Sequence, residues 1–484
     1  MAQENAVSPS PAPRTSFFAN VGALVFARAF LTASQLLILP IIARYLAVED
    51  FALMALAMTV VVFSSVLSDG GLGRSLIRTK EYDLTEWSTV FWLIAGVGAI
   101  LSMAVLAIAP LWAWFFDQPR IWSLLSCLAI VPLLQALSAA PNAEIERRER
   151  YAGLASVQII AAVVGMAAAV ALVMLGAGVW ALVAQQILLA LVRLAGIAVL
   201  TRFRPSFVFA NAVLGQHLRF ARDAIAVSLI QTGQMQTPVV AIGKFLGESA
   251  LGFYAMNQRF ARLPQFGIAG PMSAVVYVRM AKVQDSGKDL VRIYLASSRL
   301  LAAALFPALA MLSAAGTPVF TLLLGDKWAP VASIFALSIP GLTFEAVTVT
   351  YLACLLRAAG RTTLQVQMKI EGAIVAVILF VAAAFISLEA VAASITLWSL
   401  FYVPRAWILT GRVAPIGWKA CIEAVIRPVL FSAVGVVAHL SLSHAVAPGI
   451  VAEIAMAIGL MLGVYGILII LDWHSLRTAV TSLL

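Results

Sequence analysis

The feature that most constrains the fold of this chain is a series of apolar stretches of about 20 residues, which recur along its whole length. A helix of that length crosses the hydrocarbon core of a bilayer and satisfies its own backbone hydrogen bonds. The sequence therefore predicts an all-α polytopic membrane protein with about fourteen transmembrane helices. Their approximate ranges are 18–40, 51–72, 87–113, 121–143, 153–175, 179–201, 222–243, 250–277, 293–324, 329–356, 364–387, 390–410, 422–443 and 450–471.

The composition agrees with this fold class. Of 484 residues, 62% are hydrophobic and only 11% are charged, which is about half the charged fraction of a soluble domain. The connections between predicted spans are short, so no loop would hold a catalytic domain, and we expect neither an enzyme nor catalytic residues. The scattered histidines and cysteines predict no metal site and no disulfide. The sequence has no phosphate-binding loop of the G-x-x-x-x-G-K-S/T type, so we expect no cofactor and no direct use of ATP.

Charge in the loops predicts the orientation, because loops rich in Lys and Arg stay in the cytoplasm. Most of the 32 Lys and Arg fall in alternate loops on one side, near positions 74–80, 147–150, 202–222, 279–292, 357–361 and 405–419. The opposite loops carry only Arg44, Arg120, Lys244 and Lys327. We therefore predict that both termini are cytoplasmic.

An internal repeat divides the chain into two halves. At an offset of 200 residues, Arg44 aligns with Lys244 and Tyr45 with Phe245, and each segment joins the first and second helices of a half. Six spans per half is an even number, so the halves insert with the same orientation, as in parallel-repeat transporters. The predicted parts are a disordered cytoplasmic tail (1–16), an N-terminal six-helix lobe (17–201), an amphipathic cytoplasmic linker (202–221), a C-terminal six-helix lobe (222–410) and a helix pair with a tail (411–484). The linker either lies in the membrane interface against anionic headgroups or is a solvated connector.

Four ionisable residues lie near the middle of predicted spans: Arg28, Arg259, Arg262 and Glu345. A charge at that depth costs roughly 2.5–3.5 kcal/mol on insertion scales, so such residues face protein or water rather than lipid. Three of the four are arginines, whose guanidinium donates paired hydrogen bonds to phosphate. The sequence therefore predicts a channel, pump or transporter for an anionic substrate.

Polar residues accompany these arginines at helical spacing. Arg28, Thr32 and Gln35 share one helix face, and Gln258, Arg262 and Gln265 repeat their spacing. The seventh span adds Ser228, Gln231, Gln234 and Thr237. We expect a hydrophilic cavity between the bundles near the midplane, although polar residues of this kind also serve as interhelical hydrogen-bonded contacts.

The remaining charged residues within predicted spans each have two possible roles. Glu345 would either pair with one of the arginines or bind and release a proton during transport. Arg193, Arg299, Lys369 and Arg427 lie near the cytoplasmic ends of their spans, where long side chains reach the interface, so we favour anchoring roles for them. Of these four, Arg299 is kept among the candidate substrate ligands.

Several segments resemble the polysaccharide-transporter branch of the multidrug/oligosaccharidyl-lipid/polysaccharide exporter superfamily, which includes Wzx-type flippases. The segments are LSDGGLGRSLIR at 67–78, LGESALGFYAMNQRFARLP at 246–264, LLGDKWAP at 323–330 and RAAGR at 357–361. The resemblance implies a V-shaped pair of lobes in the bacterial inner membrane. It also implies that undecaprenyl-diphosphate-linked oligosaccharide moves from the cytoplasmic to the periplasmic leaflet. Arg28, Arg259 and Arg262 would then line a cationic cavity.

The expected partners follow from this resemblance. They are the lipid-linked glycan, membrane lipids, and a polysaccharide polymerase and glycosyltransferases of the same route, with no nucleic acid. We expect a monomer that is coupled to H⁺ or Na⁺. Two alternatives remain: a cation-coupled multidrug exporter of the same fold, which would favour an acidic cavity, and a membrane glycosyltransferase or ligase, which would need an acidic catalytic loop on the periplasmic side.

Overall fold

The computed structural model describes residues 30–31, 34–35, 37–69, 71–77, 82–412, 414–446 and 449–483, and all regular secondary structure in these residues is helical. The all-α prediction is confirmed. Residues 37–45 form a helix that precedes α2. The other elements are α2 (Val48–Asp69), α3 (Leu72–Ile77), α4 (Leu84–Phe115), α5 (Pro119–Leu128), α6 (Ile130–Arg147), α7 (Tyr151–Met174), α8 (Trp180–Leu200), α9 (Asn211–Phe245), α10 (Glu248–Ala261), the π-helix η1 (Pro264–Ala269), α11 (Gly270–Lys282), α12 (Gly287–Ala314), α13 (Gly316–Leu324), the 3₁₀ helix η2 (Asp326–Trp328), α14 (Val331–Ala358), α15 (Thr362–Ala384), α16 (Leu388–Thr410), α17 (Trp418–Val446) and α18 (Ile450–Leu483).

Eleven stretches within the described residues are long and apolar enough to cross a membrane. Two further predicted spans are helical but fall outside this group, because α9 carries many polar residues and the stretch at 250–277 is divided into shorter helices. Much of the predicted span 18–40 lies outside the described residues. The chain is therefore a multi-pass membrane protein, and the count of fourteen transmembrane helices stays a prediction.

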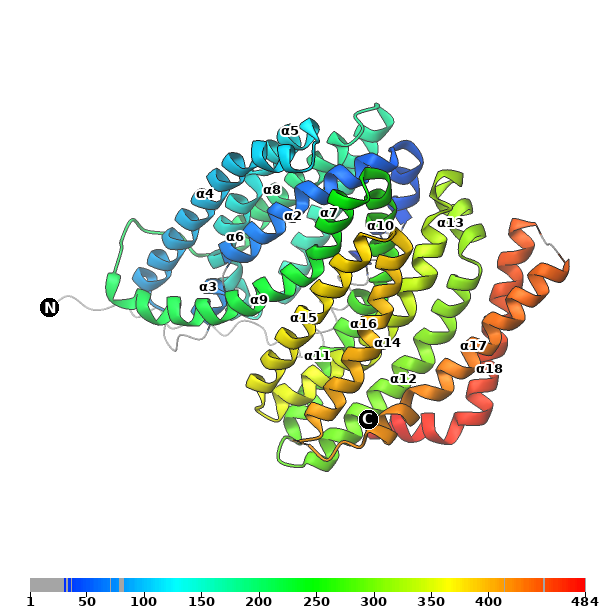
Figure 1. Cartoon of the computed structure of the whole chain (residues 1–484). Helices are drawn as coiled ribbons and strands as arrows, with labels where there is room; N and C mark the ends of the chain where they lie inside the picture. Colours follow the sequence, from blue (N-terminus) through cyan, green and yellow to red (C-terminus); the bar gives the residue numbers. More distant parts are fainter. Residues whose placement is uncertain are drawn as a thin grey trace.

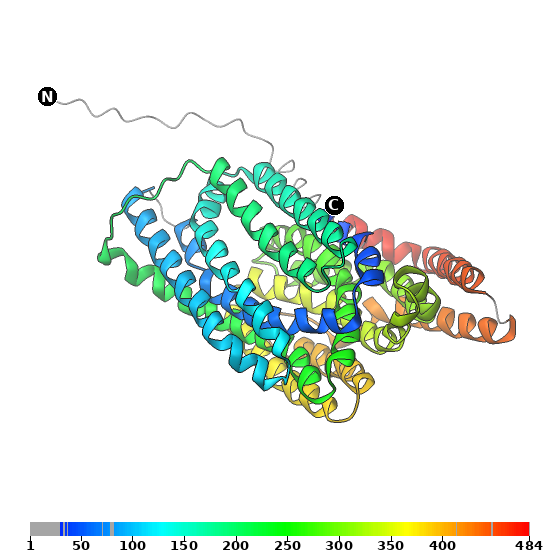
Figure 2. The same ribbon diagram turned by 90° about the horizontal axis from the view of Figure 1, so that it is seen from above.

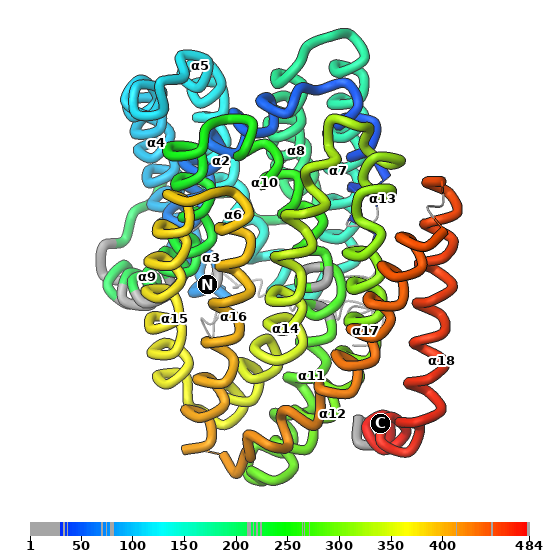
Figure 3. Tube along the Cα trace, turned by 45° about the vertical axis from the view of Figure 1, so that its right-hand side comes forward, coloured from blue at the N-terminus to red at the C-terminus, as the bar shows by residue number. Residues whose placement is uncertain are grey.

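The helices form two bundles that meet at one side of the molecule and diverge toward the other (Figure 1). We call the helix over residues 37–45 together with α2 to α8 the N-lobe, and α9 to α16 the C-lobe. The helices α17 and α18 pack along α12, on the side of the C-lobe away from the N-lobe (Figures 2 and 3). We call the side with the loops at 147–150, 201–210, 283–286 and 359–361 the basic side, and the side with the loops at 46–47, 116–118, 246–247 and 325–330 the far side.

The apolar core explains why the lobes diverge in one direction only. At the far side and in the middle, one continuous cluster joins both lobes, from Phe51 and Leu182 of the N-lobe to Leu251 and Trp328 of the C-lobe. Toward the basic side the core divides into separate clusters. One surrounds Trp87 of the N-lobe and includes Ala221 near the start of α9, and one lies within the C-lobe and α17. Apart from the start of α9, apolar side-chain contact therefore holds the lobes together at the far side and in the middle, and not toward the basic side.

The segment that joins the lobes is docked on the N-lobe. Residues 201–210 have no regular secondary structure, and the buried Phe203 packs against the ring of Trp87, with ring centroids 6.0 Å apart. The indole N–H of Trp92 donates to the carbonyl oxygen of Ser206 at 2.9 Å, and Ser206 contacts the hydroxyl of Ser88 at 3.0 Å. Beyond this segment α9 begins at Asn211 and continues to Phe245. The predicted boundary at 221/222 therefore lies inside one helix.

Candidate functional site

The polar site is centred on the point where the eighth predicted span breaks. The helix α10 ends at Ala261, and a π-helical turn over Pro264–Ala269 separates it from α11. Proline has no backbone N–H to continue the helical hydrogen bonds, and π-helical turns in helices frequently mark functional sites. Arg259 lies in the last turn of α10 and Arg262 caps its end, so both arginines project from the break.

Two adjoining cavities of about 230 and 310 Å³ lie between the lobes beside this break. Gln185 and Gln186 of α8, together with Gln258 and Arg259 of α10, line both of them. We call the two together the inter-lobe cavity. Its remaining polar lining residues in the described part of the chain are Gln35, Gln236, Tyr254 and Arg262.

Neither arginine of the inter-lobe cavity forms an ion pair with a described acidic residue. Within the described residues, neither Arg259 nor Arg262 lies within 4.0 Å of a carboxylate oxygen. The guanidinium carbon of Arg259 instead lies 5.0 Å from the ring centroid of Phe51 on the N-lobe, a cation–π distance. The cavity therefore presents unpaired positive charge, which suits an anionic ligand.

Hydrogen bonds along α10 fix the orientation of Arg262. Its Nε donates to Oε1 of Gln258 at 3.1 Å, and one terminal nitrogen approaches Oε1 of Gln265 at 3.5 Å. Gln258 in turn donates to the hydroxyl of Tyr254, which is fully buried. A guanidinium held in this way loses little further freedom when it binds a phosphate group.

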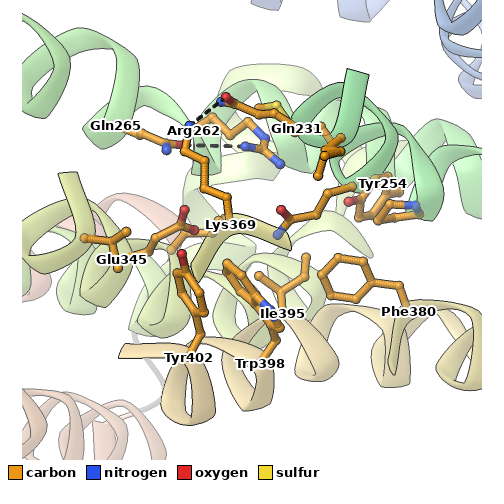
Figure 4. Close-up of a pocket in the computed structure, with 16 residues that line it drawn as sticks. Gln231, Tyr254, Arg262, Gln265, Glu345, Lys369, Phe380, Ile395, Trp398 and Tyr402 are labelled. Atoms are coloured by element: carbon orange, nitrogen blue, oxygen red, sulfur yellow. Dashed lines mark hydrogen bonds between the residues drawn. The ribbon is translucent and has the colours of Figure 1, made fainter. Parts of the chain in front are cut away.

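Arg262 also lines a second cavity, of about 110 Å³, inside the C-lobe (Figure 4). We call it the inner cavity. Gln231 and Gln234 of α9, Gln265 of η1, Glu345 of α14 and Lys369 of α15 supply its other amide and charged groups. Trp398 and Tyr402 close one wall with their rings stacked 4.8 Å apart. This volume holds a few water molecules but no sugar ring.

The inner cavity is positive overall, because two cations and one carboxylate line it. Nζ of Lys369 donates to Oε1 of Gln231 at 3.2 Å. Glu345, Lys369 and Arg262 all point into the cavity (Figure 4), yet no nitrogen of the two cations lies within 4.0 Å of the carboxylate. The Glu345 carboxylate therefore shares the cavity with two positive charges without a direct ion pair in the described residues.

Basic side chains close the far side by donating to backbone carbonyls of the opposite lobe. Arg44 donates to the carbonyl of Leu322 near the end of α13 at 2.8 Å, and Lys244 donates to that of Phe115 at the end of α4 at 2.6 Å. The last carbonyls of a helix lack backbone partners and carry partial negative charge. The repeat aligns Arg44 with Lys244, and in the fold each of the two donates to a backbone carbonyl near the end of a helix.

The GDKW segment adds to this closure. Nζ of Lys327 donates to the carbonyls of Arg44 and Leu46 at 3.1 and 2.6 Å. The buried indole of Trp328 donates to the carbonyl of Ala43 at 3.0 Å and packs edge-on against Phe51. We call Arg44, Lys244, Lys327 and Trp328 the far-side clasp.

The structure gathers most of the residues singled out from the sequence, and it separates them into two cavities. Gln35, Gln258 and Arg259 line the inter-lobe cavity, Gln231, Gln234 and Glu345 line the inner cavity, and Arg262 lines both. Arg299 lies on α12 and lines neither of these cavities. Arg28 and Thr32 lie outside the described residues.

The sequence analysis did not identify several polar residues of the cavities, among them Gln236 and Tyr254 of the inter-lobe cavity. Lys369 was interpreted as an interface anchor, but it points into the inner cavity. Gln185 and Gln186 were passed over, although two adjacent amides in the middle of an apolar span were a visible signal. None of these residues is a charged residue at the centre of a span, where the cost of a charge in lipid makes a residue conspicuous in the sequence.

Comparison with solved structures defines the class of fold. The chain resembles the lipid II flippase MurJ in an inward closed conformation, with a TM-score of 0.74 and 13% identity over 93% of this chain and 98% of that chain. It also resembles an inward-facing multidrug resistance MATE family transporter of the MOP superfamily, with a TM-score of 0.61 and 16% identity over 80% of this chain and 98% of that chain. The chain therefore has the fold that these two solved structures share.

Sequence comparison identifies the family to which the chain belongs. Residues 41–333 match the family described as polysaccharide biosynthesis protein, and the chain belongs to that family. It is 27% identical to the succinoglycan biosynthesis transport protein ExoT of Rhizobium meliloti over 66% of this chain, and 24% identical to the lipopolysaccharide biosynthesis protein WzxC of Escherichia coli over 61% of this chain. These alignments span 65% of ExoT and 61% of WzxC, less than two thirds of either protein. The resemblance to polysaccharide transporters is confirmed.

Proposed function

We propose that this protein is a flippase that moves undecaprenyl-diphosphate-linked oligosaccharide from the cytoplasmic to the periplasmic leaflet of the bacterial inner membrane. The product would serve the synthesis of a surface polysaccharide. The observation that carries the proposal is the pair Arg259 and Arg262, which faces the inter-lobe cavity without an acidic partner in the described residues. A diphosphate supplies the negative charge and the oxygen atoms that two guanidinium groups bind best. The names of the similar proteins, which include succinoglycan transport, support this substrate class.

Alternating access between the two lobes would carry the substrate. We take the basic side to be cytoplasmic, since loops rich in Lys and Arg stay there. The diphosphate would enter from that side and bind Arg259 and Arg262, while the lipid tail stays in the bilayer. Release on the other side requires the far-side clasp to open and the basic ends of the lobes to approach each other.

Glu345 is the residue that we assign to energy coupling. Its carboxylate shares the inner cavity with Lys369 and Arg262, and their charges oppose the entry of Na⁺. A proton binds the carboxylate itself and needs no further oxygen ligands, whereas Na⁺ does, so we assign H⁺ as the coupling ion. Arg262 lines both cavities, and through it the charge of Glu345 would act on the bound diphosphate.

The protein would act as a monomer and without catalytic residues or a cofactor. Its partners would be the polymerase and glycosyltransferases that act before and after it on the same lipid-linked glycan, together with membrane lipids. The names of the similar proteins refer to transport and biosynthesis of polysaccharides, which agrees with this assignment.

The test is the double variant Arg259→Ala/Arg262→Ala in the native host. We expect surface polysaccharide to fall at least about tenfold and lipid-linked repeat units to accumulate, since two charge-assisted contacts would be lost. Arg361→Ala, in the exposed turn before α15, is the matched control and should leave export unchanged. Normal export by the double variant, at wild-type protein abundance, would refute the assignment.

A further inference from the structure

The wall of the inter-lobe cavity that belongs to the N-lobe differs chemically from the wall that belongs to the C-lobe. Both arginines of the cavity come from α10 of the C-lobe. Among the described lining residues that precede α9, the polar ones are Gln35 on the first helix and Gln185 and Gln186 of α8, and the others are apolar, such as Leu182 and Met166. One wall therefore suits an anion, and the other suits a neutral polar group.

The amides of the C-lobe wall already have partners within the protein. Gln236 accepts a hydrogen bond from the hydroxyl of Thr59 at 3.1 Å. Gln258 accepts from Arg262 at 3.1 Å and donates to Tyr254. These amides are used to position other side chains and have little capacity left for a ligand.

The amides of Gln185 and Gln186 have no hydrogen-bond partner among the described residues, and both side chains are only partly buried. Close packing of α7 on α8 fixes the helix that carries them: a Cβ built on Gly165 would lie 3.1 Å from the backbone oxygen of Gln185. Two neighbouring amides on a rigid helix thus face the cavity with their donors and acceptors unused by the protein. A polar group at membrane depth is costly unless a partner satisfies it.

We infer that Gln185 and Gln186 form a subsite for sugar hydroxyl groups, opposite the arginines that bind the diphosphate. Each amide offers a donor and an acceptor to a hydroxyl that is itself both, which charged groups do not do. The inference rests on the proposed function and extends it, because it places the sugar nearest the lipid against the N-lobe. The bound substrate then contacts both lobes, and selection among glycans falls to α8 rather than to the arginines.

The experiment measures binding of two probes to the full-length protein in nanodiscs. The probes are undecaprenyl diphosphate and the same lipid with a single hexose, glucose and galactose being tested separately. The better hexose probe should bind the wild type about 5- to 150-fold more tightly than the sugar-free lipid, the range for two net hydrogen bonds. In Gln185→Leu/Gln186→Leu this difference should vanish, while the affinity for undecaprenyl diphosphate stays within about twofold of wild type.

The control is Gln158→Leu, which changes a glutamine of the same lobe that lines none of the cavities described above. It should behave as the wild type with both probes. If the hexose adds nothing to wild-type affinity, or if the double variant loses affinity for both probes equally, the sugar subsite is refuted and the flippase proposal is untouched. If the wild type binds neither probe, the proposed function itself fails.

Discussion

Replacing Lys327 by Met should loosen the far-side clasp without disturbing the core. The ammonium group is exposed and makes two hydrogen bonds, at 3.1 and 2.6 Å, to carbonyls at the end of the helix over residues 37–45. Hydrogen bonds from a charged group contribute about 1.5–3 kcal/mol each in buried sites, and exposure reduces this severalfold. We therefore expect a loss of about 1–2 kcal/mol, which shifts the equilibrium between closed and open far sides about 5- to 30-fold.

The shift is measurable as a change in distance between the lobes. If the closed state is about 99% populated in the wild type, its population should fall to roughly 75–95% in the variant. Ser123 of α5 and Ser333 of α14 are exposed at the far side and belong to opposite lobes. Spin labels attached at these two positions would report the distance between the lobes. The native cysteines, Cys127, Cys354 and Cys421, would first be replaced by alanine.

Pulsed electron-spin resonance in nanodiscs should show one short distance for the wild type and an added longer distance for Lys327→Met. Lys288→Met, an exposed lysine in the first turn of α12 on the basic side, should give the wild-type distribution. The combination with Arg44→Met should enlarge the long-distance population further, since it removes the 2.8 Å contact with α13. Identical distributions for wild type, single variant and double variant would show that the clasp does not hold the far side closed.

Three further predictions concern the site and the lobe contact. Glu345→Gln should flatten the pH dependence of transport in vesicles, because the amide cannot take up a proton, and an unchanged pH profile would limit Glu345 to a structural role. Gln258→Leu should weaken binding of undecaprenyl diphosphate about 3- to 10-fold at normal expression, since it removes the acceptor that orients Arg262, and wild-type affinity would contradict this positioning role. Gly252→Ala should lower the unfolding temperature in detergent through a loss of about 1–3 kcal/mol, because a Cβ there would lie 2.2 Å from the carbonyl oxygen of Val48, and an unchanged temperature would mean that α2 and α10 separate freely.

Local composition was sufficient to predict the helical spans, because the bilayer accepts long apolar helices and few other structures. It was also sufficient to predict that Arg259 and Arg262 face a polar space, since a central arginine is too costly in lipid. Lys369 is a residue whose position could not be predicted from local composition. A lysine two turns from a helix end reaches either the interface or the protein interior, and the sequence does not distinguish these positions.

Contacts between distant segments were beyond prediction for a similar reason. The repeat aligned Arg44 with Lys244, but their acceptors are backbone carbonyls of helices in the other lobe, and any residue type supplies a carbonyl. The docking of residues 201–210 on α4 depends on how Phe203 fits between aromatic rings, which amphipathic periodicity does not express.

The sequence by itself determined that this protein lies in a bilayer, that it is helical and that it carries positive charge at membrane depth, because each follows from the cost of placing a residue type in hydrocarbon. The tertiary structure alone decided that Arg262 lines two cavities, that Gln185 and Gln186 face the arginines, and that the lobes close at the far side. These features depend on which helix faces which, and packing of whole side-chain surfaces sets those pairings rather than the preference of any single residue.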